Sequence, residues 1–373
     1  MDLLSLTRDQ LAAELKRLGH PRYRAAQLCA WIYERRAKRF EEMTNLPAGL
    51  RAQLAASHAL RPLTKIRETG SMDTTRKFLF QLQDGQLIET VLIPASPALY
   101  GEPSDRRTVC ISSQVGCAYG CKFCASGLDG VKRNLTAGEI VAQFLAVEEL
   151  SGEKINNIVF MGMGEPFANY RNLMQAIGIL NAPWGLAVGA RNMTVSTSGL
   201  VPRIIEFADQ PVQIRLAISL HAATDEVRSK IMPVNRRYPL RELMDACQYY
   251  CSRKSQPLTL EYILIRGLND SEEQAHRLVD HARRLDFSVR FGVQRYATRQ
   301  ADIAASGLLD RELDERQHGG FASILHGKGD IFETVVNFTF RRPLRPKPPG
   351  DGRRAVIAIK QQRRIDAVYL FIQ

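Results

Sequence analysis

The sequence lacks any apolar run of about 18 or more residues, the length that a helix needs to cross a membrane. Residues 1–5, Met-Asp-Leu-Leu-Ser, also lack the basic stretch and following apolar stretch of a secretory signal. These two absences predict a cytoplasmic protein that has no membrane partner.

Acidic residues are fewer than basic residues. The 39 Asp and Glu residues stand against 51 Lys and Arg residues, which gives a net charge of +12. A basic protein attracts polyanions such as RNA, although charge by itself is weak evidence for such a partner. Apolar residues make up 45% and charged residues 24% of the 373, so we expect a globular protein with one large and one small domain.

Cysteine is scarce but concentrated. Three of the seven cysteines, Cys117, Cys121 and Cys124, have the spacing C-x3-C-x2-C in one glycine-rich loop. A loop that turns this tightly can direct three thiolates at one centre, and thiolates suit iron–sulfur clusters or zinc. This use of cysteine fits a reducing compartment better than a disulfide scaffold.

Three interpretations of the cysteine loop remain open at this point. A zinc site would need a fourth protein ligand, and no paired C-x2-C or H-x3-H follows. A four-iron cluster held by three thiolates would leave one iron open for a substrate or cofactor. The third alternative is three buried or incidental cysteines.

The cysteine spacing is the signature of the radical S-adenosylmethionine (SAM) superfamily, and five further runs narrow the resemblance. They are Cys110–Cys117 (CISSQVGC), Arg133–Leu135 (RNL), Met161–Pro166 (MGMGEP), Val195–Gly199 (VSTSG) and Ile218–Ala222 (ISLHA). Together they resemble the RlmN/Cfr family, whose members methylate C2 or C8 of adenine in ribosomal and transfer RNA. The match extends from about residue 20 to about residue 285.

Residues 1–60 are predicted to form a helical accessory domain that binds RNA. Thr7 and Gln10 have the spacing of a capping box, and Leu11 and Leu15 continue with helical apolar spacing. Phosphate contact and a solvated helix face are about equally good interpretations of its basic side chains. These are Arg22, Arg24, Arg35, Arg36, Lys38 and Arg39.

Residues 61–106 are predicted to be a β-hairpin and a linker. Residues 75–82 and 86–93 alternate in hydrophobicity and flank an Asp84-Gly85 turn. Proline-rich residues 94–105 then lead into the main domain.

Residues 107–330 are predicted to form an α/β core, because strands and helices alternate. The expected strands are 108–112, 157–161, 192–196, 213–219 and 258–264, and capping boxes at Thr136–Glu139 and Ser271–Gln274 open two helices. The resemblance implies a partial (β/α)6 barrel. In such a barrel the chemistry lies at the C-terminal ends of the strands, where the motifs fall.

The resemblance assigns the cofactor ligands. Cys117, Cys121 and Cys124 are implied to hold a [4Fe–4S] cluster whose open iron binds SAM, which the reduced cluster cleaves to a radical. Further residues are implied to bind SAM, namely Gly164, Glu165, Ser196, Ser219, Leu220 and His221. We expect the glycines to allow close backbone approach and the carboxylate to accept from the SAM ammonium. The alternative for His221 is a hydrogen-bonded histidine at a strand end.

Two catalytic residues are also implied. Glu89 stands where the family has its proton acceptor, although its pattern alone favours an outward-facing side chain. Cys110 stands where the family has a cysteine that resolves a protein–RNA adduct by forming a disulfide; by itself it is a small buried apolar residue. Cys247 and Cys251, one turn apart on a predicted helix, are expected to be packing residues.

The resemblance stops near the C-terminus. The family's mechanism uses a C-terminal cysteine that carries the methyl group, and no cysteine follows Cys251. Residues 321–329 resemble the family's last helix, whereas residues 331–373 form a divergent tail in which residues 343–354 are of doubtful order. A resemblance that disappears and returns suggests shifts of reading frame, which resequencing would test; the alternative is a genuinely divergent tail.

The resemblance therefore implies a radical SAM enzyme that methylates adenine in 23S rRNA and also in tRNA, and we favour C2 over C8 as the methylated carbon. A [4Fe–4S] cluster, SAM and a reductant such as flavodoxin are implied, and we expect a monomer. The target adenine must leave its stack to reach the barrel mouth. Three alternatives are a homologue that does not methylate, a radical SAM enzyme acting on a small molecule, and a zinc-containing RNA-binding protein.

Overall fold

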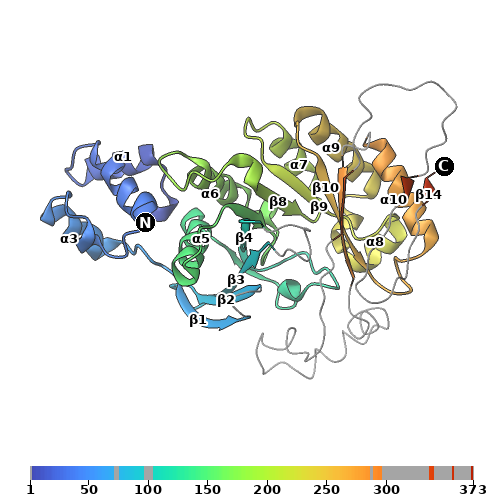
Figure 1. Cartoon of the computed structure of the whole chain (residues 1–373), viewed down its shortest axis with the longest axis horizontal. Coiled ribbons are helices and arrows are strands. Elements are labelled where there is room, and N and C mark those ends of the chain that lie inside the picture. Colours follow the sequence, from blue (N-terminus) through green and yellow to red (C-terminus); the bar gives the residue numbers. More distant parts are fainter. Residues whose placement is uncertain are drawn as a thin grey trace. The chain divides into compact units, whose positions relative to one another are not determined.

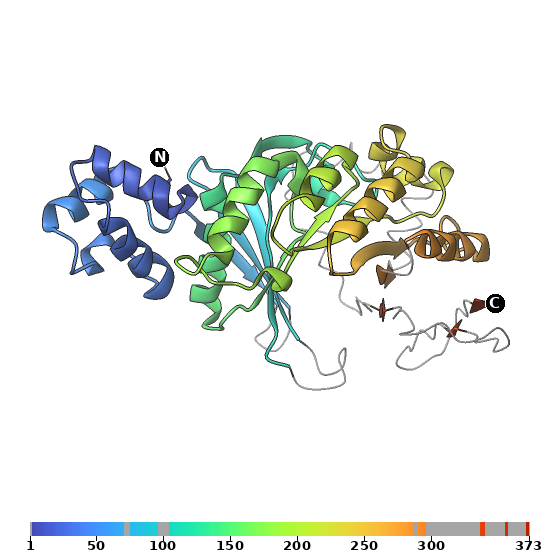
Figure 2. The ribbon, with the colours of Figure 1, turned by 90° about the horizontal axis from the view of Figure 1, so that it is seen from above.

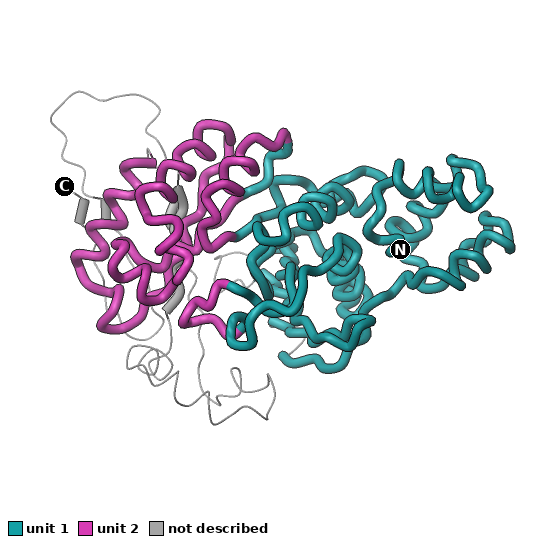
Figure 3. The backbone as a smooth tube through the Cα atoms, turned by 180° about the vertical axis from the view of Figure 1, so that it is seen from behind, with its two compact units in different colours: residues 1–118, 126–196, 212–215 teal, residues 119–125, 197–211, 216–373 magenta. Residues whose placement is uncertain are grey.

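The computed structural model describes residues 2–70, 75–95, 104–285, 289–295, 336–339, 355–356 and 371–372, with side chains up to residue 285. The chain forms two compact units, coloured separately in Figure 3. Unit 1 comprises residues 1–118, 126–196 and 212–215, and unit 2 comprises residues 119–125, 197–211 and 216–373. The cysteine loop therefore begins in unit 1 and continues into unit 2.

Unit 1 begins with short helices, drawn in blue in Figure 1: η1 (Leu3–Ser5), α1 (Arg8–Arg17), α2 (Arg24–Cys29), the π-helical η2 (Ala30–Glu34), η3 (Phe40–Glu42) and α3 (Ala48–Ser57). The capping box at the start of α1 is confirmed. The Thr7 hydroxyl accepts from the Gln10 N–H at 3.3 Å, and the Gln10 side chain accepts from the Thr7 N–H at 2.9 Å. Leu11, Leu15 and Leu28 are buried and form the core of this module.

Ion pairs tie this helical module to α5 (Ala137–Ser151). Arg36 contacts Glu148 at 2.7 Å and Lys38 contacts Glu149 at 2.8 Å. Burial would raise the pKa of Glu149, but hydrogen bonds from Lys38 and Arg61 hold it below its ordinary value. Arg36 and Lys38, expected to meet phosphates or solvent, thus have an anchoring role within the protein.

Strands follow the helical module in unit 1, as the alternating hydrophobicity of residues 75–82 and 86–93 predicted. β1 (Thr64–Thr69), β2 (Arg76–Gln81) and β3 (Leu87–Pro94) are antiparallel, and β3 pairs with the antiparallel β4 (Arg107–Cys110). The predicted hairpin of β2 and β3 is confirmed, and Gly85 in its turn has a φ of +83°. β4, β7 (Asn157–Phe160) and β8 (Met193–Thr197) then run parallel.

Helices cover these strands. Figure 2 shows α5 and α6 (Tyr170–Asn181) packed side by side against the strands of unit 1. The capping box that opens α5 is confirmed, with Thr136 and Glu139 bonded reciprocally. η5 (Pro166–Asn169) precedes α6, and a small antiparallel pair, β5 (Gln114–Gly116) and β6 (Val131–Asn134), flanks the cysteine loop in the sequence.

Unit 2 also contains parallel strands: β9 (Arg215–Ser219), β10 (Leu258–Leu264) and β11 (Val289–Arg295), with β12 (Val336–Thr339) antiparallel to β11. Its helices are α7 (Val201–Ala208), α8 (Asp225–Ile231), α9 (Leu240–Arg253) and α10 (Glu272–Arg284). On α9, Cys247 is buried and Cys251 is half-buried, in agreement with packing roles. Short strands β13 (Ala355–Val356) and β14 (Phe371–Ile372) pair with each other.

The helix α10 differs from prediction in one detail. Ser271 caps it by accepting from the Gln274 N–H at 3.3 Å, but the Gln274 side chain accepts from the Ala223 N–H instead of completing a capping box. The proposed last helix at 321–329 and residues 343–354 of the tail lie outside the described residues. Across the described ranges, no helix is both long and apolar enough to span a membrane.

Candidate cofactor and metal site

A hairpin fixes the start of the cysteine loop. The Cys117 N–H donates to the Gly130 carbonyl at 3.0 Å, just beyond the pairing of Gly116 with Val131. Gly116 and Gly130 have φ angles of +74° and +66°. A Cβ on Gly116 would lie 2.0 Å from the Gly130 oxygen, so this closure requires glycine at position 116.

The second half of the loop, residues 119–125, is held within unit 2. The Cys124 N–H donates to the Cys121 carbonyl at 3.0 Å, and the Lys122 N–H donates to the Ile231 carbonyl at the end of α8 at 2.9 Å. The Phe123 ring meets the His221 ring edge-on, with centroids 4.7 Å apart. The residues between the second and third cysteines are therefore fixed by contacts to α8 and to the end of β9.

The donor set fits an iron–sulfur cluster in type and accessibility. Cys117, Cys121 and Cys124 are half-buried thiols, and all seven cysteines, which fall within the described residues, are thiols. In that same part of the chain, no three His, Cys, Asp or Glu side chains are gathered closely enough to hold a metal ion. The structure thus supplies three accessible thiols on one short loop without bringing them into a preformed metal site, and their role as ligands stays a prediction.

Hydrogen bonds within unit 1 connect two of the sequence motifs with each other and with the strand that carries Glu89. The Ser112 hydroxyl donates to the Glu89 carbonyl at 2.5 Å and accepts from the Met163 N–H at 2.9 Å. The Gln114 side chain accepts from the Glu165 N–H at 2.8 Å. The run before the first cysteine therefore positions both the strand that carries Glu89 and the loop that carries Glu165.

The same packing explains the glycines of the MGMGEP run. A Cβ on Gly162 would lie 2.7 Å from the Ser112 hydroxyl, and one on Gly164 would lie 2.5 Å from the Gln114 Cβ. Gly164 also has a φ of +99°. We expected these glycines to admit a ligand, but the described contacts give a reason internal to the protein, namely close approach to residues 111–114.

A buried amide that the sequence analysis missed completes this network. Gln143 on α5 accepts from the Ser112 N–H at 2.9 Å and the Thr90 hydroxyl at 2.8 Å, and it donates to the Ser112 carbonyl. A polar side chain in the apolar stretch Ile140–Val147 was the available signal, because a buried amide must be hydrogen-bonded.

The other predicted residues of unit 1 lie on strands or in the loops that follow them. Glu165 is buried, and one carboxylate oxygen accepts from the Phe167 N–H at 3.0 Å. Cys110 is 9% exposed at the end of β4, and Ser196 is buried near the end of β8. Glu89 lies on β3, where its carboxylate accepts from the Lys77 ammonium at 2.8 Å. The Glu89 backbone and Glu165 belong to one bonded network, whereas their roles toward a substrate stay predictions.

Ser219, Leu220 and His221 close β9 in unit 2. The N–H groups of Leu220 and His221 both donate to the Glu261 carbonyl, at 3.0 and 3.1 Å. His221 has a φ of +55°, and its Nδ1 accepts from the Ile263 N–H at 3.2 Å. Burial, with a contribution from Arg228, lowers the pKa of His221 to about 3. His221 is thus a neutral, hydrogen-bonded histidine at a strand end, and a contact with SAM stays a prediction.

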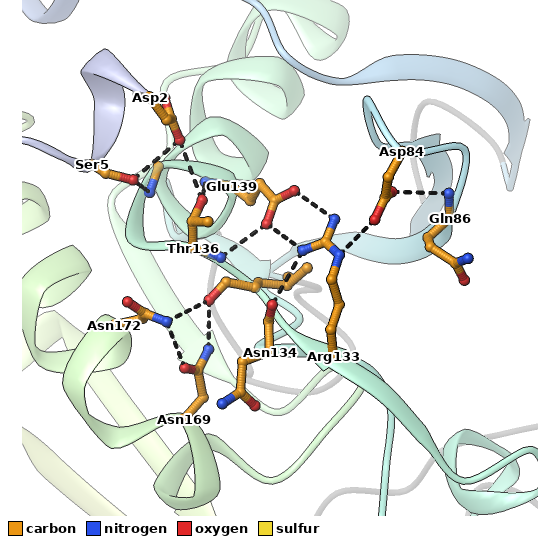
Figure 4. A network of polar contacts seen from close by, with 12 residues as sticks. Asp2, Ser5, Asp84, Gln86, Arg133, Asn134, Thr136, Glu139, Asn169 and Asn172 are labelled. Carbon is orange, nitrogen blue, oxygen red and sulfur yellow. Dashed lines mark hydrogen bonds and ion pairs between the residues drawn. The ribbon is translucent and has the colours of Figure 1, made fainter.

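The RNL run braces the hairpin against α5, as Figure 4 shows. The Arg133 guanidinium donates to Asp84 at 2.6 Å and to both oxygens of Glu139 at 2.8 Å. The hydrogen bond from Arg133 lowers the pKa of Asp84. Leu135 contributes its carbonyl, which accepts from Asn169 at 2.7 Å.

Comparison with known proteins identifies the family. The profile of the "Radical SAM superfamily" matches residues 111–279, and that of the "Ribosomal RNA large subunit methyltransferase N-terminal domain" matches residues 1–60. A protein of Opitutus terrae, named probable dual-specificity RNA methyltransferase RlmN 3, is 50% identical over 346 residues, which cover 90% of this chain and 89% of the relative. The chain belongs to the RlmN family.

Another RlmN relative and a solved structure support this family assignment. A probable dual-specificity RNA methyltransferase RlmN of Akkermansia muciniphila is 50% identical over 283 residues, covering 76% of this chain and 79% of the relative. The crystal structure of a radical SAM methyltransferase from Sphaerobacter thermophilus superposes with a TM-score of 0.74 at 43% identity, covering 84% of this chain and 93% of that one. The predicted fold class, a radical SAM α/β partial barrel with an N-terminal helical domain, is confirmed. The RlmN relatives do not favour the alternative of a homologue without methyltransferase activity.

The neutral His221 predicts acid sensitivity in this RlmN family member. Because its folded pKa lies below its unfolded value, its stabilising contribution is complete above about pH 6.5 and is lost as the pH falls toward 3. Through this one group, the free energy of unfolding changes by at most about 1.4 kcal/mol per pH unit. His221→Asn, whose side chain tolerates a positive φ, should lower stability near pH 7.5 but flatten this dependence.

Urea unfolding at several pH values between about 5 and 8 would measure how the free energy of unfolding depends on pH. His276→Asn is the matched control, because this histidine on α10 is exposed and its substitution should leave the slope of the parent protein. Equal slopes for His221→Asn and the parent would contradict the prediction.

Proposed function

We propose that this RlmN family member methylates C2 of an adenine in 23S rRNA, and of an adenine in tRNA, with a [4Fe–4S] cluster and SAM. The observation that carries the proposal is the hairpin-closed loop with three accessible thiols, in a chain 50% identical to proteins named dual-specificity RNA methyltransferases. The place of action is then the cytoplasm, where ribosomes and tRNA are found.

In this proposal Cys117, Cys121 and Cys124 hold the cluster. When bound, the cluster and SAM supply the one-electron chemistry that an unactivated ring carbon of adenine requires. The protein contributes binding and orientation. We assign SAM binding to the residues that the family resemblance implies, namely Gly164, Glu165, Ser196, Ser219, Leu220 and His221. The buried Glu165 carboxylate suits an ammonium group, because charged hydrogen bonds are strong where water is excluded.

Glu89 is assigned as the proton acceptor. Its side chain is 29% exposed and paired with Lys77, so it can reach a bound base while a fixed ammonium and β3 hold it in place. Cys110, buried at the end of β4, is assigned as the thiol that resolves the protein–RNA adduct, a step that needs the methyl-carrying cysteine as the second thiol of the disulfide.

RNA binding is assigned to the helical module. Arg22 and Arg35 are exposed there, whereas Arg36 and Lys38 are paired with glutamates of α5. The Arg35 guanidinium lies 4.3 Å from the Trp31 ring centre, and aromatic–arginine surfaces stack on unpaired bases. We further propose a monomer that takes electrons from a reductant such as flavodoxin.

The missing C-terminal cysteine defines the decisive test. No cysteine follows Cys251, so the methyl carrier that the resemblance implies is absent from this sequence. The anaerobically reconstituted chain should be assayed for iron and sulfide, for SAM cleavage, and for methyladenine in RNA from a strain that lacks the modification. Nucleoside mass spectrometry that finds 2-methyladenine supports the proposal. SAM cleavage without methyladenine would replace it with the alternative of a homologue that does not methylate, and zinc in place of iron would overturn the cluster.

Glu89→Gln should reduce RNA methylation by about 100-fold or more, because the isosteric amide cannot accept a proton. Cluster content and thermal stability should stay close to those of the parent, since the side chain is partly exposed. Lys77→Gln is the control: it removes the ion-pair partner and keeps the carboxylate, so methylation should fall much less. Equal losses in both variants would indicate that the ion pair matters and that Glu89 is not the base.

A further inference from the structure

A guanidinium lies fully buried in unit 2 and is paired with neutral groups. Arg228 on α8 has 0% of its surface exposed. Among the described residues, no carboxylate is hydrogen-bonded to it, and its acceptors are three main-chain carbonyls and the amide oxygen of Asn235 at 2.9 Å. Burying a charge without an opposite charge costs several kcal/mol, so such an arrangement is seldom kept without a use.

The carbonyls that Arg228 holds belong to the loops after two strands. Ser198, which follows β8, accepts at 2.6 Å, and Ser219 and Leu220 at the end of β9 accept at 3.2 and 3.0 Å. A Cβ on Gly199 would lie 3.3 Å from the guanidinium, so the chain passes close to it. Arg228 thereby positions the backbone of residues assigned above to SAM binding.

The same helix holds the cysteine loop. The Ile231 carbonyl, one turn after Arg228, accepts from the Lys122 N–H at 2.9 Å. Burial lowers the pKa of Arg228 to about 10. The helix that carries the buried guanidinium is therefore hydrogen-bonded to the residue directly after the second cysteine of the loop.

These observations share one explanation. Thiolates that bind metal are deprotonated, so three of them give the loop a negative charge that grows when a cluster takes up an electron. We propose that Arg228 is the buried positive charge that balances this site: it stabilises the reduced cluster and positions the Ser219–Leu220 backbone beside it. The inference rests on the proposed function, since it requires a cluster at Cys121.

Removing the charge should make the cluster harder to reduce. In Arg228→Met, the ratio of reduced to oxidised cluster at a fixed potential should fall about tenfold or more, which is about 59 mV for a one-electron couple. An anaerobic redox titration followed by electron paramagnetic resonance measures this ratio. Arg228→Lys, which keeps the charge but loses the forked hydrogen bonds, should stay within about threefold of the parent while binding SAM more weakly.

Lys230→Met is the matched control. It removes one positive charge from the same helix, but at an exposed position where solvent screens the charge, so the ratio should not change. A cluster-loaded Arg228→Met with the parent's ratio would overturn the inference. If that variant holds no cluster, Asp225→Asn decides, because losing the negative charge near Arg228 should raise the ratio, and an unchanged or lower ratio would refute the role. A parent protein without iron would instead refute the proposed function.

Discussion

Replacing Cys117, Cys121 or Cys124 with alanine should reduce the iron of the reconstituted protein from about four atoms per chain to less than about one. Each thiolate is one of three protein ligands in the proposed site, and a cluster with two remaining ligands is not retained. SAM cleavage and RNA methylation should fall to background in all three variants. This is the largest effect that we expect from any single side chain.

Anaerobic iron and sulfide analysis with absorption spectra measures the loss. Cys251→Ala is the control, because this cysteine is half-buried on α9, outside the loop, and should leave the iron content unchanged. Thermal unfolding of the proteins without added iron should be similar for all variants, since the three thiols are half-buried. A variant that lacks one loop thiol yet keeps about four irons would contradict the ligand assignment.

Local signals made much of the fold predictable. The predicted strand 258–264 coincides with β10, and the capping boxes at Thr7 and Thr136 are formed as expected. Each depends on residues a few positions apart, where periodicity and side-chain chemistry determine the conformation. The Asp84-Gly85 turn belongs to the same class, because a hairpin turn restricts its own residues.

Long-range contacts were not predictable in this way. Gln143 and Ser112 are 31 positions apart, and Arg228 and Ser198 are 30 apart, so no spacing rule connects them. Gln143 and Arg228 are buried polar side chains on helices, and the sequence of each helix does not indicate which distant residue they contact. The motif residues could be named from the resemblance, but the reason for Gly162 and Gly164 emerged only from the packing of residues 111–114.

Gly116→Ala should prevent cluster loading although it removes no thiol. An added Cβ would lie 2.0 Å from the Gly130 carbonyl oxygen, which accepts from the Cys117 N–H. This oxygen is a backbone atom, so no side-chain rotation can relieve the clash. The hairpin that closes the loop would have to open. We expect the free energy of unfolding to fall by about 3 kcal/mol or more and the iron content to fall to less than about one atom per chain.

Gly120→Ala is the control that shows the effect of backbone strain without the steric clash. Gly120 lies in the same loop with a φ of +56°, close to the +74° of Gly116, but a Cβ there meets nothing within 4 Å. Its substitution should cost only the strain of a positive φ, about 1 kcal/mol, and leave cluster loading nearly intact. Iron analysis and thermal unfolding of the two variants side by side test the argument. If both lose iron equally, glycine flexibility in the loop governs loading; if neither does, the hairpin closure at Gly130 does not position Cys117 for its ligand role.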